Sequence, residues 1–208
     1  MSIRFQEELG AAGIDFDAFA RDDNQIKIQR KAPFPLEILV ATPPAQPQPL
    51  GQILVLAPHP NRLIDAFASE VEGVLEAFDK TWPAPNRQVL SCDVALRCLY
   101  RSTTEHAFKE IWEQRLCQPE ALLKSFGRPV LGGGLRFVMP PQPGESEPKQ
   151  IEVKIESFLG DTTQVFVETQ FVWPSPRAGN AFEPKARLGE VNQYITQSVE
   201  AFLMEGRS

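Results

Sequence analysis

The stretch Ile151–Trp173 most constrains what this chain can fold into. It holds two segments in which apolar and polar residues alternate, separated by Gly-Asp-Thr-Thr at 160–163, a composition typical of a turn. The apolar positions are Ile151, Val153 and Ile155 in the first segment, and Val165, Val167, Phe171 and Trp173 in the second. A period of two places these side chains on one buried face and the polar ones on a wet face. Since a two-stranded ribbon is only marginally stable, the buried face needs a helix or another sheet across it.

The rest of the pattern predicts strands and helices in consecutive groups. Strands are expected over 26–30, 34–41, 52–57, 89–101 and 130–139, and helices over 3–12, 61–78, 104–116, 120–126 and 188–204. The acidic segment 14–25 is expected to form a turn. Because neighbouring strands follow one another through short links, we predict an α+β fold, in which amphipathic helices pack on one face of a mainly antiparallel sheet.

The clearest predicted helix is 61–78, where apolar residues recur at spacings of three and four. Acidic residues occupy the other faces of this helix. The residues expected to be largely buried against the sheet are Leu63, Phe67, Val71, Val74 and Phe78.

The length of the chain suits a single domain. Its 208 residues fall within the usual range for one folding unit, so we predict one domain over 1–208. Strands followed by an amphipathic helix occur twice, an order compatible with a pseudo-duplication into halves of about 1–101 and 102–208. No residue-level repeat accompanies this order, so the arrangement of elements is its only support.

Charge and cysteine content limit the class of partner and the compartment. The formal net charge is −6, which disfavours nonspecific nucleic-acid binding because that needs a basic surface. No run approaches the roughly 18 apolar residues of a membrane-spanning helix, and the N-terminus shows no apolar signal segment. The three cysteines have no CxxC spacing, which is typical of reduced thiols. We therefore expect a cytoplasmic protein that binds neither nucleic acid nor membrane.

The sequence lacks the motifs that would indicate catalysis or metal binding. Its two histidines, His59 and His106, have no partner at ligand spacing. The triplet Gly132-Gly133-Gly134 lacks the frame of a phosphate-binding loop, so we interpret it as a bulge or a close backbone crossing. We expect no cofactor and no metal, and a non-enzymatic role is favoured over an enzymatic one.

Three arginines form a candidate binding surface. Arg97 and Arg101 share one face of the predicted strand 89–101 with Asp93, and Arg136 lies in the glycine-flanked strand. If these strands are neighbours, the arginines line one sheet surface, where they could bind carboxylates or phosphates. The alternative interpretation is a solvated sheet face with cross-strand salt bridges.

Trp173 is the fourth candidate binding residue. If the strand Gln164–Trp173 lies at a sheet edge, its unpaired backbone groups could add a strand from a partner or from a second copy in a symmetric homodimer. Trp173 would then anchor the contact. In the competing interpretation Trp173 completes the core where Pro174 ends the strand.

No motif in the chain identifies a family, but the predicted layout has a counterpart. The order helix, three strands, helix, strand over residues 3–101 is similar to that of small secretion-chaperone-like domains. This resemblance implies an acidic, cytoplasmic protein without an active site, although a shared fold does not establish a function.

Two functions of different classes are compatible with these features. The first is a non-enzymatic protein-binding module of the adaptor, chaperone-like or immunity type, which uses an exposed sheet face or edge to hold a protein partner. Its basis is the negative charge, the absence of motifs and the many strands. The alternative is a small-molecule-binding domain or an enzyme, with a pocket in which Arg97, Arg101 or Arg136 contacts an anionic ligand.

Overall fold

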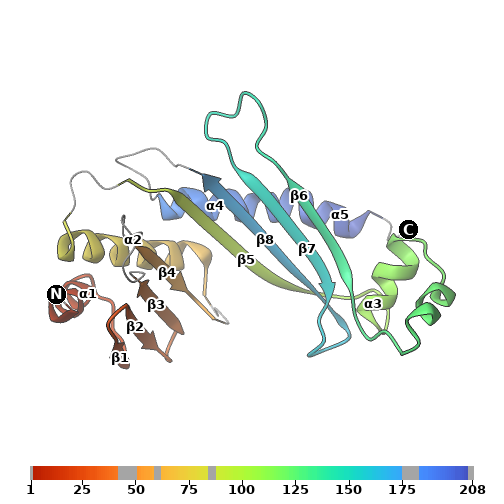
Figure 1. Cartoon of the computed structure of the whole chain (residues 1–208), viewed down its shortest axis with the longest axis horizontal. Helices are drawn as coiled ribbons and strands as arrows, with labels where there is room; N and C mark the ends of the chain where they lie inside the picture. The colour runs from red at the N-terminus through yellow and green to blue at the C-terminus, as the bar shows by residue number, and fades with distance from the viewer. Residues whose placement is uncertain (1, 42–50, 59–61, 84–87, 175–182, 206–208) are drawn as a thin grey trace. The chain divides into compact units, whose positions relative to one another are not determined.

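The computed structural model describes residues 2–41, 51–58, 62–83, 88–174 and 183–205. Contacts between residues divide the chain into two compact units, Met1–Arg87 with Phe182–Ala186, and Gln88–Ala181 with Arg187–Ser208. Each unit contains an antiparallel four-stranded sheet, which confirms the α+β class predicted from the sequence (Figure 1). The division falls before the strand at 91–101, whereas the halves inferred from the sequence place this strand in the first half. The single domain over 1–208 stays a prediction.

The first unit is a meander of four strands with two helices. In chain order its elements are α1 (Ser2–Ala11), β1 (Ala18–Arg21), β2 (Gln25–Arg30), β3 (Leu36–Ala41), β4 (Gln52–Leu56) and α2 (Ile64–Thr81). The strands pair in the order β1-β2-β3-β4, each antiparallel to the next. β1 lies within the segment predicted as a turn, so that prediction is wrong there. Its four residues are mostly exposed, and it therefore carries no apolar pattern that would mark a strand.

Both helices of the first unit contribute to one core with the sheet. Phe5 and Leu9 of α1 and Val74 of α2 are fully buried, and Ile28 and Ile38 of the strands pack with them. The apolar stripes of the helices and the alternation of the strands therefore meet as their spacing predicts.

Helix α2 begins at Ile64, later than the sequence predicts. Leu63 therefore lies outside the helix and is 80% exposed, so its predicted burial is wrong. The other four positions of the predicted stripe fall inside the helix. Val74 is fully buried, and Phe67, Val71 and Phe78 are half-buried.

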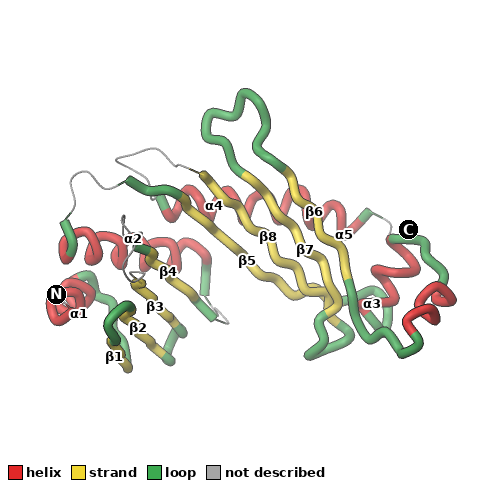
Figure 2. Tube along the Cα trace, in the orientation of Figure 1, coloured by secondary structure: helices red, strands yellow, loops and turns green. Residues whose placement is uncertain are grey.

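The second unit contains a longer sheet and the C-terminal helical segment. Its elements are β5 (Ser91–Arg101), α3 (Ala107–Lys109), η1 (Glu110–Arg115), η2 (Glu120–Phe126), β6 (Gly134–Met139), β7 (Gln150–Ser157), β8 (Gln164–Pro174), α4 (Pro184–Tyr194, of which 184–186 belong to the first unit), η3 (Ile195–Val199) and α5 (Glu200–Met204). The strand order is β5-β8-β7-β6, and every pair is antiparallel. From Arg187 onward, α4, η3 and α5 form one helical segment that runs along one face of this sheet (Figures 1 and 2).

The hairpin predicted from alternation is β7 and β8. Ile155 lies opposite Val167, and both are buried together with Phe171, under Val191 and Ile195 of the helical segment. The helix that the ribbon needs across its buried face is thus the C-terminal one.

The hypothesis that the second hairpin strand lies at a sheet edge is wrong. β8 lies inside the sheet, between β5 and β7, so its backbone groups are already paired on both sides. The hairpin pairs one side of β8 with β7. The other side pairs with β5, a strand from much earlier in the chain whose position the alternation of residues does not reveal. The edges of this sheet are β5 and β6.

The glycine triplet marks a close crossing of two backbones, as the sequence predicts. A Cβ atom on Gly134 would lie 2.1 Å from the carbonyl oxygen of Ile155 in β7. No side chain fits at that distance, so glycine is required where β6 starts to pair with β7.

Candidate functional site

The second sheet has one covered face and one open face. Side chains alternate along its strands, pointing either toward the helical segment or away from it. We call the side turned away from the helices the outer face. It carries Ala95, Arg97, Leu99 and Arg101 from β5, Phe166, Glu168 and Val172 from β8, Glu152 and Lys154 from β7, and Arg136 and Val138 from β6. The three arginines singled out in the sequence therefore lie on a single surface.

A row of charged side chains crosses the outer face over all four strands. Arg97 donates to Glu168 over 2.6 Å, and Lys154 donates to the other oxygen of that carboxylate over 2.7 Å. Lys154 also lies 3.3 Å from Glu152, which accepts two hydrogen bonds from Arg136, at 2.9 and 2.8 Å. Strand register explains the row, since Glu168 lies opposite both Arg97 and Lys154. We call these five residues the charge ladder.

The charge ladder keeps its carboxylates ionised. Burial raises the pKa of Glu168, but hydrogen bonds from Lys154 and Arg97 outweigh burial, and the net pKa is lowered. The hydrogen bonds from Arg136 likewise lower the pKa of Glu152. In return, the bond to Glu168 raises the pKa of Lys154, and the bonds to Glu152 raise the pKa of Arg136. Because exposed ion pairs add little stability each, the main effect of the ladder is a fixed pattern of charge.

We expect replacement of Glu168 by glutamine to lower the free energy of unfolding at neutral pH and to lower it less as the pH falls. A carboxylate whose pKa is lowered on folding stabilises the fold above its unfolded pKa of about 4.3, and this contribution is lost as the pH falls through the folded pKa. The free energy of unfolding of the wild type should therefore exceed that of Glu168→Gln at neutral pH, and the two should converge below about pH 4. Urea denaturation across this range measures the difference.

A salt series provides the control for this pH dependence. High salt should shrink the difference at neutral pH, because the ladder is partly exposed and its charges are screened. A difference that persists unchanged down to about pH 3 would show that the ionised Glu168 is not its origin.

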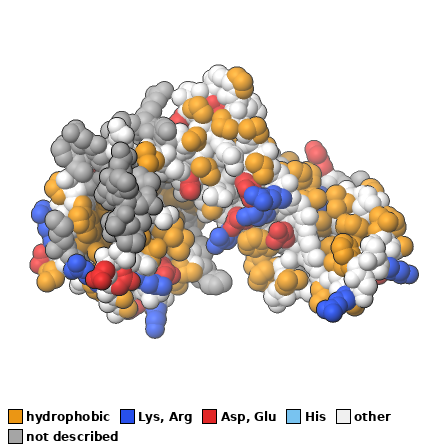
Figure 3. All heavy atoms as spheres, in the orientation of Figure 1, with side chains coloured by type: hydrophobic (Ala, Val, Ile, Leu, Met, Phe, Trp, Pro, Cys, Tyr) orange, Lys and Arg blue, Asp and Glu red, His pale blue; other side chains and the backbone are white. Residues whose placement is uncertain are grey.

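Apolar side chains surround the charge ladder. Leu99 of β5 is 51% exposed and Val138 of β6 is 52% exposed. Phe166 and Val172 of β8 are half-buried on the same face. In the space-filling view, hydrophobic side chains lie around the basic and acidic ones over the second sheet (Figure 3). Exposed apolar groups beside ordered charges are the composition expected of a surface that contacts another macromolecule.

The three arginines differ in their acidic neighbours. Arg97 and Arg136 are joined through the ladder. Arg101 is exposed at the end of β5, and its charge helps to lower the pKa of Asp161, which is held down mainly by a hydrogen bond from Thr163. Arg97 and Arg136 thus belong to cross-strand ion pairs, and Arg101 lies near the carboxylate of Asp161, so the three guanidinium groups do not converge on one anion.

Trp173 lies on the opposite side of the sheet, in the core. It is 1% exposed, and the guanidinium carbon of Arg187 lies 4.3 Å from the centre of its ring. Arg187 is held there by two hydrogen bonds to Glu147. This placement fits the interpretation of Trp173 as a core residue, and a side chain so covered offers no surface to a partner in this conformation.

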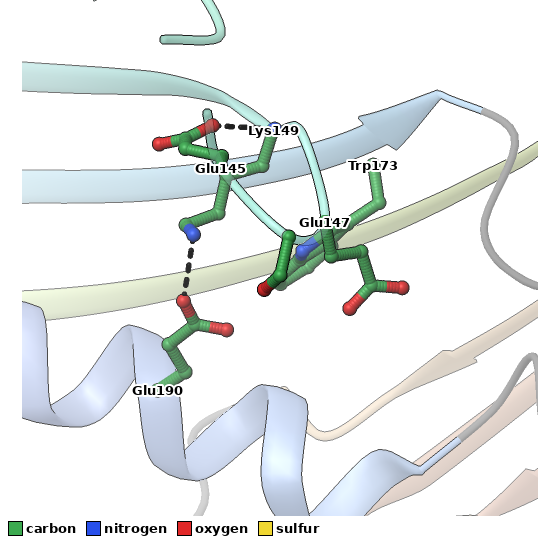
Figure 4. A pocket seen from close by; sticks show the side chains of 6 residues that line it. Glu145, Glu147, Lys149, Trp173 and Glu190 are labelled. Atoms are coloured by element: carbon green, nitrogen blue, oxygen red, sulfur yellow. Dashed lines mark hydrogen bonds and ion pairs between the residues drawn. The ribbon is translucent and has the colours of Figure 1, made fainter. Parts of the chain in front are cut away.

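A pocket beside Trp173 has an acidic lining. It measures about 230 Å³ and is lined by Glu145, Ser146, Glu147, Lys149, Trp173 and Glu190 (Figure 4). Lys149 pairs with Glu190 over 2.9 Å, and its backbone N–H donates to Glu145 over 3.3 Å. Within the described residues the indole Nε1 of Trp173 has no hydrogen-bond partner. None of the three arginines predicted to contact an anionic ligand lines this pocket.

The residues that the structure describes offer no metal site and no membrane-spanning helix. No group of three or more His, Cys, Asp or Glu side chains there could hold a metal ion, and no helix there is long and apolar enough to cross a bilayer. The three cysteines are free thiols, and burial raises the pKa of Cys92 and Cys98. Raised values disfavour the thiolate and so oppose a nucleophilic role for these two. His59 lies outside the described residues.

Sequence reasoning missed the apolar part of the outer face. Leu99, Phe166, Val172 and Val138 occupy positions that alternation assigns to the wet side of their strands. An apolar residue at a position that alternation assigns to the polar side of a strand is the signal that could have found them.

Comparison of the chain with protein-family models, curated proteins and solved structures finds no match.

Proposed function

We propose that this protein is a non-enzymatic binding module that holds a protein partner on the outer face of its second sheet. The observation that carries the proposal is an open sheet face where two aliphatic side chains, Leu99 and Val138, are more than half exposed beside an ordered charge ladder. Such a face combines apolar contact area with a charge pattern that can select a partner and fix its orientation. The role we propose is of the adaptor, chaperone-like or immunity type.

Two features support binding rather than catalysis. The five charged side chains of the ladder are paired with one another across strands, so their charges form a fixed pattern. The face is also carried by strands of a packed sheet, and a rigid support lowers the entropy lost on binding.

The proposal predicts that Val138→Lys weakens partner capture. A lysine at this position can pair with Glu152, which lies directly opposite on β7, so β6 should keep its pairing. The charge would nevertheless occupy apolar contact area, and we expect about a thirtyfold loss of affinity if Val138 is a central contact. The measurement is capture of partners from the native host by the tagged protein, followed by titration of the captured protein with each variant.

Leu122→Lys is the matched control. Leu122 is also 52% exposed and belongs to the same unit, but it lies in η2, away from the outer face. An equal loss of affinity for the partner in both variants would indicate a general effect of added charge. Undiminished capture by Val138→Lys, with unchanged stability in urea, would remove the outer face as the binding site.

A further inference from the structure

We propose that the exposed edge of β5 pairs with the same edge of a second copy of this chain, giving a symmetric dimer with a continuous eight-stranded sheet. The contact uses the edge of the second sheet and not its outer face. It therefore goes beyond the proposed function and does not depend on it.

The two edges of this sheet are not equally open. β6 has six residues, starts at the glycine triplet and is followed by Pro140 and Pro141, features that limit strand addition. β5 has eleven residues, Ser91–Arg101, with no proline, and within the described part of the chain it pairs on one side only, with β8. A long edge without protection presents a row of unpaired backbone groups that another strand can complete.

The residues of β5 are complementary to themselves under a two-fold axis. With the axis at Arg97, antiparallel pairing places Asp93 opposite Arg101 of the second copy, and Ala95 opposite Leu99 of the second copy. Each ionic and each apolar pair then occurs twice, as an isologous contact requires. Arg97 faces its own counterpart, but it already donates to Glu168 over 2.6 Å, so its charge is compensated within each copy.

Neighbouring registers lack this match. An axis at Leu96 would set Asp93 against Leu99 and Ala95 against Arg97. An axis at Ala95 would bring Asp93 opposite Arg97 and leave Arg101 without a counterpart on the strand. The register centred on Arg97 is favoured because it gives both Asp93 and Arg101 a partner of opposite charge, whereas Arg97 is already paired with Glu168 within each copy.

The apolar side chains of β5 that face the helices also favour the addition of a strand. Val94, Leu96, Cys98 and Tyr100 alternate along it and are only partly buried at the margin of the core. In the same register Leu96 meets Cys98 of the second copy, and Val94 meets Tyr100. An added strand would thus bury a half-exposed apolar row in addition to pairing the backbone.

Charge reversal tests the dimer on the purified chain. Sedimentation should show a reversible monomer–dimer equilibrium, and Asp93→Arg or Arg101→Asp should weaken it by about tenfold, because each creates two like-charged pairs. The double variant Asp93→Arg/Arg101→Asp should restore wild-type association, since it exchanges the two charges. Glu105→Arg, an exposed position of the same unit outside β5, is the control and should leave association unchanged.

Disulfide trapping tests the register. Facing residues of an antiparallel pair have Cα atoms about 4.5–5.5 Å apart, within the range that a disulfide spans. In a Cys117→Ser background, which removes the exposed native thiol, Arg97→Cys should oxidise to a covalent dimer. Leu99→Cys should not do so alone, but it should form a mixed dimer with Ala95→Cys.

The outcomes separate this inference from the proposed function. A wild-type chain that stays monomeric up to high concentration, or a dimer indifferent to Asp93→Arg, would overturn pairing through β5. Either result leaves the Val138→Lys capture experiment unaffected, because Val138 lies on the opposite edge strand. Conversely, loss of the partner-binding proposal would leave the sedimentation and trapping results standing.

Discussion

Arg115→Ala is expected to lower the free energy of unfolding by about 3–5 kcal/mol. The guanidinium of Arg115 lies 3.2 Å from a carboxylate oxygen of Glu110, whose side chain is 2% exposed. It also donates to the carbonyl oxygens of Phe202, Leu203 and Glu205 at the end of α5. Truncation would leave a buried carboxylate without a counter-charge and the helix end without donors.

Chemical denaturation with two comparisons tests this expectation. Lys109→Ala removes an exposed lysine whose ammonium lies 3.9 Å from Glu113, and it should cost less than about 1 kcal/mol. Burial raises the pKa of Glu110, but hydrogen bonds from Thr103, Ser102 and Arg115 outweigh burial and lower it. Without Arg115 this pKa rises, so the loss of stability should be smaller in acid, where Glu110 is protonated. A loss under about 1 kcal/mol at neutral pH would show that the pair is dispensable.

Trp173→Ala is expected to cost about 3–5 kcal/mol, as for other large aromatic residues removed from a core. The centre of the Trp173 ring lies 5.6 Å from that of Phe171, and the guanidinium carbon of Arg187 lies 4.3 Å from the same ring centre. Removal would leave a cavity and also expose the Arg187–Glu147 pair to water.

Denaturation and sedimentation of this variant together separate a core role from an interface role. If Trp173 is a core residue, the variant has a lower free energy of unfolding as a monomer. An interface anchor would instead weaken association and keep the free energy of unfolding. Trp112→Ala is the comparison within the same unit, because that side chain is only half-buried and its indole donates to Pro119 over 3.3 Å. Retained stability of Trp173→Ala with lost association would assign Trp173 to a contact between chains.

Local patterns were sufficient for much of the fold. Alternation over Ile151–Trp173 predicts the β7–β8 hairpin and its buried face, because the side-chain period of a strand is a property of the backbone itself. The same period places Arg97 and Arg101 on one face of β5. Where the apolar pattern is weak, as in β1, a strand held by backbone pairing escapes detection.

The order of strands could not be predicted from these patterns. Alternation is the same for an edge strand and a central one, so it left open the hypothesis of an edge position for β8, with which β5 in fact pairs along its whole length. Arg97 and Glu168, which begin the charge ladder, are 71 residues apart in the chain. Pairing over such a distance depends on the cost of closing the intervening loops and on the fit of whole faces, which no short window contains.

The sequence by itself therefore determined the α+β class, the buried face of the hairpin and the shared face of Arg97 and Arg101 on β5. The tertiary structure alone decided which carboxylates pair with Arg97 and Arg136, that Leu99 and Val138 stay exposed beside them, and that β5 pairs on one side only among the described residues. The physical reason is the separation along the chain of the residues that interact. Side-chain direction follows from neighbours along the chain, whereas pairing, exposure and edges follow from which distant strands come together.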